Sequence, residues 1–181
     1  MAQALKLRKT GLRPTLSKVR QAIFNIIARR VEGSVFMDLY AGTGAIGMEA
    51  MSRGAREVYF VESDRKTAGI LRDLLEGCGC RPKAHILPVK ADAFLKRAGK
   101  EGVRADIVFL DPPYASGELE KILPRITSEK VLAEGAVVIA EHSSKVSLPE
   151  ETGILRKKKV YKYGDTSLTL YVAMEREEGE Q

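Results

Sequence analysis

The stretch DLYAGTGAIG, residues 38–47, places three glycines at the spacing G-x-G-x-x-G a few residues after an acidic residue. A glycine loop between a hydrophobic strand and a helix lets a ligand approach the backbone closely, and the amides of the helix N-terminus can hold an anion. This spacing is typical of dinucleotide sites. By itself it indicates only a close backbone approach, so residues outside the glycines must identify the ligand.

Two acidic residues favour S-adenosylmethionine over a dinucleotide. Asp38 lies four residues before Gly42, where it would repel a pyrophosphate but attract an ammonium or a sulfonium cation. Glu62, twenty positions after Gly42, is placed to accept hydrogen bonds from ribose hydroxyls. Asp38 could instead be a buried carboxylate that caps the loop amides. Asp92 is placed equally well to accept from an adenine amine or to cap the next helix.

An acid, two prolines and an aromatic ring end the hydrophobic run IVFLDPPY, residues 107–114. The prolines could simply stiffen the exit of a strand. Methylation of an exocyclic base amine calls for this set of groups, because the amine lone pair is delocalised into the ring. The Asp111 carboxylate and the Pro112 carbonyl can accept the two N–H bonds while Tyr114 stacks on the extruded base. We therefore predict Asp111, Pro112 and Tyr114 as the catalytic residues of a base-amine methyltransferase.

Basic residues fill the N-terminal segment, where eight lysines and arginines precede the first acidic residue, Glu32. The whole chain carries a net charge of +6. A basic stretch without acidic residues favours a polyanion partner over a merely solvated surface. A second basic run at residues 156–162 is the alternative RNA surface. The residues that we expect to contact RNA phosphates are Arg8, Lys9, Arg13 and Arg20.

Strand and helix patterns alternate along the chain, which predicts an α/β fold with a mostly parallel sheet. The expected strands are residues 34–40, 57–62, 84–89, 105–110 and 135–142, with helices between them. An N-terminal helical segment over residues 14–30 precedes the sheet, and a terminal antiparallel hairpin over 154–163 and 167–175 completes it. In such sheets ligands bind beyond the carboxyl ends of the strands. Those ends carry Asp38, Glu62, Asp92 and Asp111.

Length and composition exclude several protein classes. At 181 residues the chain suits one domain with one site. It has no apolar run near the ~20 residues that span a bilayer and no apolar signal core, so we expect a cytoplasmic protein without a membrane partner. Two cysteines and two histidines are too few, at unsuitable spacing, for a metal site.

From about Gly11 to Met174, the sequence resembles the bacterial 16S ribosomal RNA guanine-N2 methyltransferases. The resemblance rests on GLRPTLSKVRQAIFNII, DLYAGTGAIGMEAMSRGA, VESD, ADAF, DPPY and YGDT. The first of these segments is the most specific, since DPPY also occurs in adenine and cytosine amine methyltransferases. Two features depart from the family. Ser17 stands where members often have Asp, and the basic N-terminal arm is short.

This resemblance implies a Rossmann-like methyltransferase sheet that uses S-adenosylmethionine to methylate the N2 amine of a guanine. The partner would be 16S rRNA or a small-subunit assembly particle, and we expect a monomer. The expected division is a basic segment and helix (1–31), a methyltransferase domain (32–174) and an acidic tail (175–181). The residues implied to bind the cofactor are Asp38, Tyr40, Ala41, Gly42, Gly44, Glu62, Asp92 and Asp111.

Three other functions remain open at this point. A DNA or other RNA amine methyltransferase, for example one acting on adenine N6, would carry the same IVFLDPPY motif. An NAD-dependent oxidoreductase would need a catalytic His, Tyr or Lys, and the Tyr161-Lys162 pair lies in the expected hairpin. A catalytically silent RNA-binding protein would use only the basic surface. Cofactor binding separates this last alternative from the methyltransferases.

Overall fold

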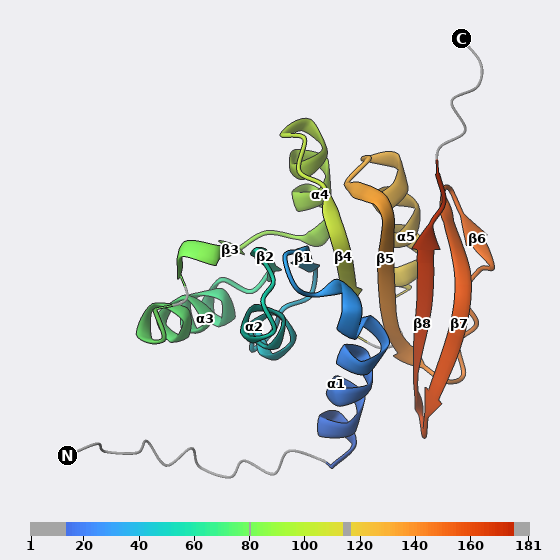
Figure 1. The fold of residues 1–181 in the computed structure, drawn as a ribbon, viewed down its shortest axis with the longest axis horizontal. Helices are drawn as coiled ribbons and strands as arrows, with labels where there is room; N and C mark the ends of the chain where they lie inside the picture. The colour runs from blue at the N-terminus through green and yellow to red at the C-terminus, as the bar shows by residue number, and fades with distance from the viewer. Residues whose placement is uncertain (1–13, 80, 114–116, 176–181) are drawn as a thin grey trace.

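Hydrophobic strands and amphipathic helices alternate in the computed structural model, which describes residues 14–79, 81–113 and 117–175 (Figure 1). In chain order the elements are α1 (Pro14–Ile27), the 3-10 helix η1 (Ala28–Arg30), β1 (Val35–Asp38), α2 (Ala45–Ser52), β2 (Glu57–Val61), α3 (Arg65–Gly77), the 3-10 helix η2 (Arg81–Lys83), β3 (Ala84–Leu87), α4 (Ala91–Lys100), β4 (Ala105–Leu110), α5 (Glu118–Ser128), β5 (Leu132–Ser143), β6 (Glu151–Thr152), β7 (Leu155–Tyr163) and β8 (Thr166–Ala173).

All eight strands form one sheet in the order β3-β2-β1-β4-β5-β8-β7-β6. The first five pair in parallel, and β8, β7 and β6 continue the sheet with antiparallel pairing. This arrangement confirms the predicted mostly parallel α/β sheet with a terminal hairpin. Two details differ: β5 begins at Leu132 and not at residue 135, and the short strand β6 was not predicted.

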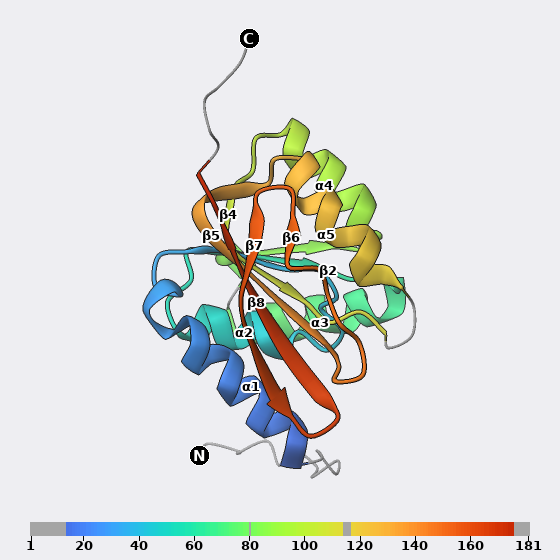
Figure 2. The same ribbon diagram turned by 90° about the vertical axis from the view of Figure 1, so that its right-hand side faces the viewer.

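Helices cover both faces of the sheet, with α4 and α5 on one face and α1, α2 and α3 on the other (Figure 2). On the α4/α5 face the core includes Phe94 and Ile122, packed with Val108 of β4. The opposite face buries Leu71 together with Phe60 of β2. A sheet covered on both sides needs nearly continuous hydrophobic strands, which explains why β1 and β4 read as apolar runs.

Helix α1 begins at Pro14, as predicted, and buries one apolar side against the sheet. Val19, Ile23 and Phe24 of α1 are at most 3% exposed and share one core cluster with Phe36 of β1. The division at residue 31 stays a prediction, and α1 packs into the same core as the sheet that follows it. In the described part of the chain no helix is long and apolar enough to cross a membrane.

Candidate functional site

A cavity of about 460 Å³ lies at the carboxyl edge of the parallel strands. Strands β1, β4 and β5 all end there, because parallel neighbours run in the same direction. Helix α1 forms one wall with Ser17, Val19, Arg20 and Ile23. The rest of the lining consists of Asp38, Tyr40, Ala41, Gly42, Thr43, Ala45, Ile46, Phe109, Asp111 and Glu141. The structure therefore brings the glycine loop, Asp38 and Asp111 together, as the sequence predicted.

The three glycines of the loop serve different purposes. Gly42 has a φ of +51°, and a Cβ on it would meet nothing within 4 Å, so its open side is available to a ligand. A Cβ on Gly44 would collide with Leu71, and one on Gly47 with the ring of Phe60. Gly44 and Gly47 are thus explained by the close packing of α2 and its N-terminal turn on the rest of the domain.

Glu62 holds the glycine loop through its side chain. Its Oε2 accepts a hydrogen bond from the Gly42 amide at 3.0 Å, and its Oε1 accepts one from the Asp64 amide at 2.8 Å. Asp64 in turn caps α3, since its Oδ1 accepts from the Thr67 amide at 2.7 Å. Each carboxylate oxygen has a second lone pair. Glu62 can therefore fix the loop and still accept hydrogen bonds from a ribose, which stays a prediction.

Asp38 ends β1 as a buried carboxyl group, 1% exposed. Its Oδ1 has no hydrogen-bond partner, and no other buried side-chain oxygen or nitrogen of the described residues lacks one. Burial raises the pKa of Asp38 to about 7, and the charge of Asp111 adds to the rise, while backbone N–H groups of Gly47 and Tyr40 lower it. A buried oxygen without a partner is costly unless a ligand completes it. Asp38 therefore fits a cationic group such as the ammonium of an amino acid.

Asp111 directly follows β4 at the rim of the cavity and is exposed. Nearby protein still removes enough water to raise the pKa of its carboxyl group to about 6. The next residue, Pro112, is buried. Tyr114, the third predicted catalytic residue, lies outside the described residues. Asp111 is thus charged at neutral pH and accessible to a group that approaches from outside.

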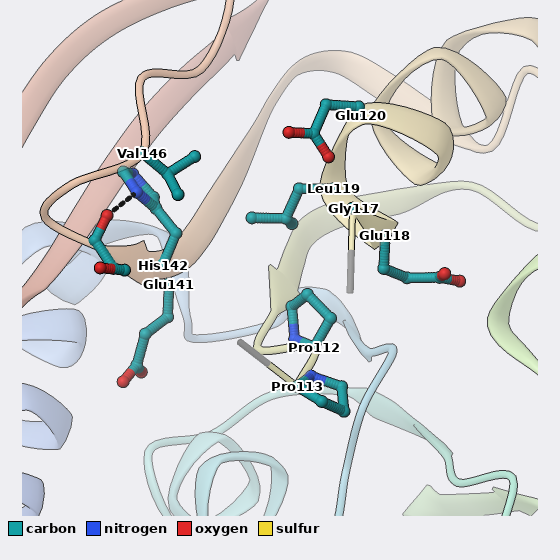
Figure 3. A pocket seen from close by; sticks show the side chains of 10 residues that line it. Pro112, Pro113, Gly117, Glu118, Leu119, Glu120, Glu141, His142 and Val146 are labelled. Carbon is teal, nitrogen blue, oxygen red and sulfur yellow. Dashed lines mark hydrogen bonds between the residues drawn. The ribbon is translucent and has the colours of Figure 1, made fainter. Parts of the chain in front are cut away.

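A second, smaller cavity of about 150 Å³ adjoins Pro112 and Pro113 (Figure 3). Its other walls come from the start of α5, with Glu118 and Leu119, and from the end of β5. Tyr40 of the first cavity reaches toward this region, since its hydroxyl donates to Glu118 Oε1 at 3.4 Å. Burial raises the pKa of Tyr40, so its hydroxyl stays protonated. The two cavities are therefore neighbours around the IVFLDPPY motif.

Other predicted residues take different positions. Asp92 lies in the first turn of α4 without capping it, and its Oδ1 forms an ion pair with Arg125 Nε at 2.6 Å. It is not among the residues that line the first cavity, so its contact with adenine stays a prediction. Arg20 lines that cavity from α1. The other three predicted RNA contacts, Arg8, Lys9 and Arg13, lie outside the described residues.

Glu141 is an acidic residue of the site that the sequence did not predict. It is 8% exposed, lies near the end of β5 and lines both cavities. A signal was present, because Glu141 follows the apolar run AVVIA just as Asp111 follows IVFL. Across the described residues, no group of three or more His, Cys, Asp or Glu side chains could hold a metal ion.

Comparison with known proteins places this site in a family context. The family model described as Conserved hypothetical protein 95 matches residues 2–172. A putative rRNA methyltransferase YlbH of Bacillus subtilis is 35% identical over 90% of this chain and 88% of its own length. The ribosomal RNA small subunit methyltransferase D of Haemophilus influenzae is 31% identical over 84% of this chain and 80% of its own.

Solved structures share the fold as well. A putative methyltransferase yhhF from Escherichia coli superposes with a TM-score of 0.80 at 28% identity, covering 87% of this chain and 86% of the other.

Proposed function

The chain belongs to the Conserved hypothetical protein 95 family, together with ribosomal RNA small subunit methyltransferases, and we propose from this membership and the site that it methylates the N2 amine of a guanine in 16S rRNA. The methyl donor is S-adenosylmethionine. The observation that carries the proposal is the pair of carboxyl groups at one cavity: the buried Asp38, with an oxygen that lacks a partner, and the accessible Asp111 of the IVFLDPPY motif.

Residues of the first cavity fit the parts of the cofactor. Asp38 would accept from the ammonium of its amino-acid portion, and the open side of Gly42 lets that portion approach the loop. Tyr40 and Ala41 line the same cavity. Glu62 is not among its lining residues but holds the Gly42 amide, and from there it would accept from the ribose. When bound, S-adenosylmethionine supplies a methyl group on a sulfonium centre. The same cavity offers a pyrophosphate two nearby carboxylates, which disfavours a dinucleotide.

On the acceptor side, the chain's own groups orient the base. The Asp111 carboxylate and the Pro112 carbonyl would accept the two N–H bonds of the amine and fix its direction. Tyr114 would stack on the base once it has swung out of the RNA. The amine releases a proton after methylation, and Asp111 or water accepts it. No strong base is needed, because the methylated nitrogen is acidic while it is cationic.

The RNA would lie across the N-terminal segment beside the first cavity. Arg20 supports this orientation because it lines the cavity from α1. We propose that Arg8, Lys9 and Arg13 contact phosphates and not bases, since they belong to a stretch of basic residues without acidic ones. We propose that the protein acts as a monomer on rRNA or on an assembling small subunit in the cytoplasm.

Modification of small ribosomal subunits that lack this methyl group tests the proposal. Purified protein and isotopically labelled S-adenosylmethionine should transfer label to the 16S rRNA, and nuclease mapping should find it on the N2 of one guanine. Free 16S rRNA and double-stranded DNA serve as parallel substrates. Label on adenine N6, or transfer to DNA alone, would replace the proposed substrate.

A further inference from the structure

Glu141 is the residue that the two cavity linings share among the described residues. Figure 3 shows it at the end of β5, on the opposite side of the smaller cavity from Pro112 and Pro113. Its strand lies between β4 and β8, and Glu141 itself pairs with Leu168 of β8. Because β5 is paired on both sides, the backbone of Glu141 is fixed in position next to the smaller cavity.

His142, the neighbour of Glu141, does not compete as a proton acceptor. Its Nδ1 lies 2.9 Å from the Ser143 carbonyl and donates to it, so its Nε2 accepts from the Thr169 hydroxyl at 2.7 Å. Desolvation lowers the pKa of His142, which keeps the ring neutral. His142 thus completes the wall with both nitrogens engaged. The Glu141 carboxylate beside it has several lone pairs, so it can accept a hydrogen bond from a base edge in addition to its contacts within the protein.

The edges of the purines differ in what a carboxylate can bind. Guanine presents two adjacent donors, N1–H and the N2 amine, whereas adenine presents its N6 amine beside an N1 acceptor. A carboxylate only accepts hydrogen bonds, so it can take the N1–H of guanine. Against adenine, the same oxygen would face the lone pair of N1. An acidic side chain in this position therefore favours guanine, a choice that the IVFLDPPY motif alone leaves open.

We propose that Glu141 selects guanine by accepting a hydrogen bond from N1–H. The two amine hydrogens stay with the Asp111 carboxylate and the Pro112 carbonyl, so the amine is held at the boundary between the two cavities. This assignment rests on the proposed function. It gives Glu141 contact with the substrate and makes it the specificity residue of the site.

Replacement of the target guanine by 2-aminopurine tests this assignment. The analogue keeps the amine that is methylated, but its N1 is an acceptor. Wild-type protein should methylate the analogue at least about 100-fold more slowly than guanine, because a site built for a donor rejects its absence strongly. Glu141→Gln can turn its amide N–H toward the N1 acceptor of the analogue and donate to it. It should lose activity on guanine and shift the guanine to 2-aminopurine ratio by about 10-fold or more.

Two controls accompany the substitution. Glu134→Gln makes the same change in the same strand at an exposed position outside both cavities and should leave the ratio unchanged. Affinity of Glu141→Gln for S-adenosylhomocysteine should stay within about 2-fold. An unchanged ratio, or a loss of cofactor affinity instead, overturns the assignment to the base. If wild-type protein modifies no guanine at all, it is the proposed function that fails.

Discussion

Asp38 and Asp111 lie at the ends of neighbouring strands, β1 and β4, yet their carboxyl groups meet different surroundings. Asp38 is buried with one oxygen that has no partner, whereas Asp111 is exposed at the rim. Burial raises both pKa values, to about 7 and about 6. An acidic residue after an apolar strand is thus buried in one case and exposed in the other. In the proposed function, the buried Asp38 would accept from the cation of the cofactor and the exposed Asp111 from the incoming base.

The largest expected effect is on the rate of methyl transfer and comes from replacing the exposed Asp111. Asp111→Ala should lower single-turnover methyl transfer by about 100-fold or more, because it removes orientation and charge at the transferring nitrogen. Affinity for S-adenosylhomocysteine, measured by titration calorimetry, should change little. If transfer proceeds at the normal rate, Asp111 does not hold the base, and the contrast between the two carboxyl groups loses its functional meaning.

Cofactor affinity should depend on pH through the buried Asp38. A bound ammonium favours the charged carboxylate, so the folded protein must release a proton on binding when the pH lies below about 7. Affinity for S-adenosylhomocysteine should therefore rise as pH increases from 6 to 8, by about 10-fold. Asp38→Asn should bind weakly at every pH in that range. A flat profile for the wild-type protein would show that Asp38 does not face the ammonium.

The stability of the ligand-free protein should fall as pH rises, opposite to the change in cofactor affinity. The pKa of Asp38 is raised from 3.8 to about 7, so the ligand-free folded protein loses stability from this group as pH rises through that window. Asp38→Asn removes this dependence. The free energy of unfolding of Asp38→Asn minus that of wild type should be about 2 to 3 kcal/mol more positive at pH 8 than at pH 5. Urea denaturation at both pH values measures this difference. An equal difference at the two pH values would contradict the raised pKa of Asp38.

Replacing Glu62 should have a smaller effect on cofactor affinity. Removing a charged acceptor should cost about 1 to 3 kcal/mol of cofactor affinity in Glu62→Ala. Part of that loss would come through the loop, because the Gly42 amide loses its 3.0 Å partner. Glu62→Gln keeps an acceptor oxygen and should recover part of the affinity. NADH should not bind to any of these proteins, and binding of NADH in place of S-adenosylhomocysteine would reverse the ligand assignment.

The smallest expected effect concerns RNA affinity. Neutralising Lys9 and Arg13 should flatten the dependence of log affinity on log salt by about 1 to 2 units, at about 0.7 to 0.9 per phosphate contact. Cofactor affinity should not change. The comparison variant neutralises Lys158 and Lys162, which are exposed on β7. A flatter slope only in the β7 variant would move the RNA surface to the terminal hairpin.

The sequence predicted the fold well because its strongest signals are local. Apolar runs marked β1 and β4, and Pro14 marked the start of α1. The two-residue strand β6 escaped prediction, since so short a segment has no periodicity of its own. The sequence also placed Asp38, Gly42 and Asp111 at one edge, and they do line one cavity.

What could not be predicted depends on contacts between distant segments. Asp92 forms an ion pair with Arg125, thirty-three residues away, and no local pattern announces that partner. The separate purposes of Gly42 and Gly47 appear only when Phe60 is packed against α2. Glu141 acquires its position from β4 and β8, whose pairing with β5 comes from the complete sheet.

The position of β8 has a consequence for the timing of synthesis. Strand β8 is the last strand of the described chain, yet it lies between β5 and β7 and pairs with β5 from Val137 to Ser143. During translation, β5 therefore has an unpaired edge until residues 166–173 have emerged from the ribosome. Glu141 lies on that edge. The pocket wall is the last part of the sheet to be assembled, so a nascent chain still lacking β8 should be inactive.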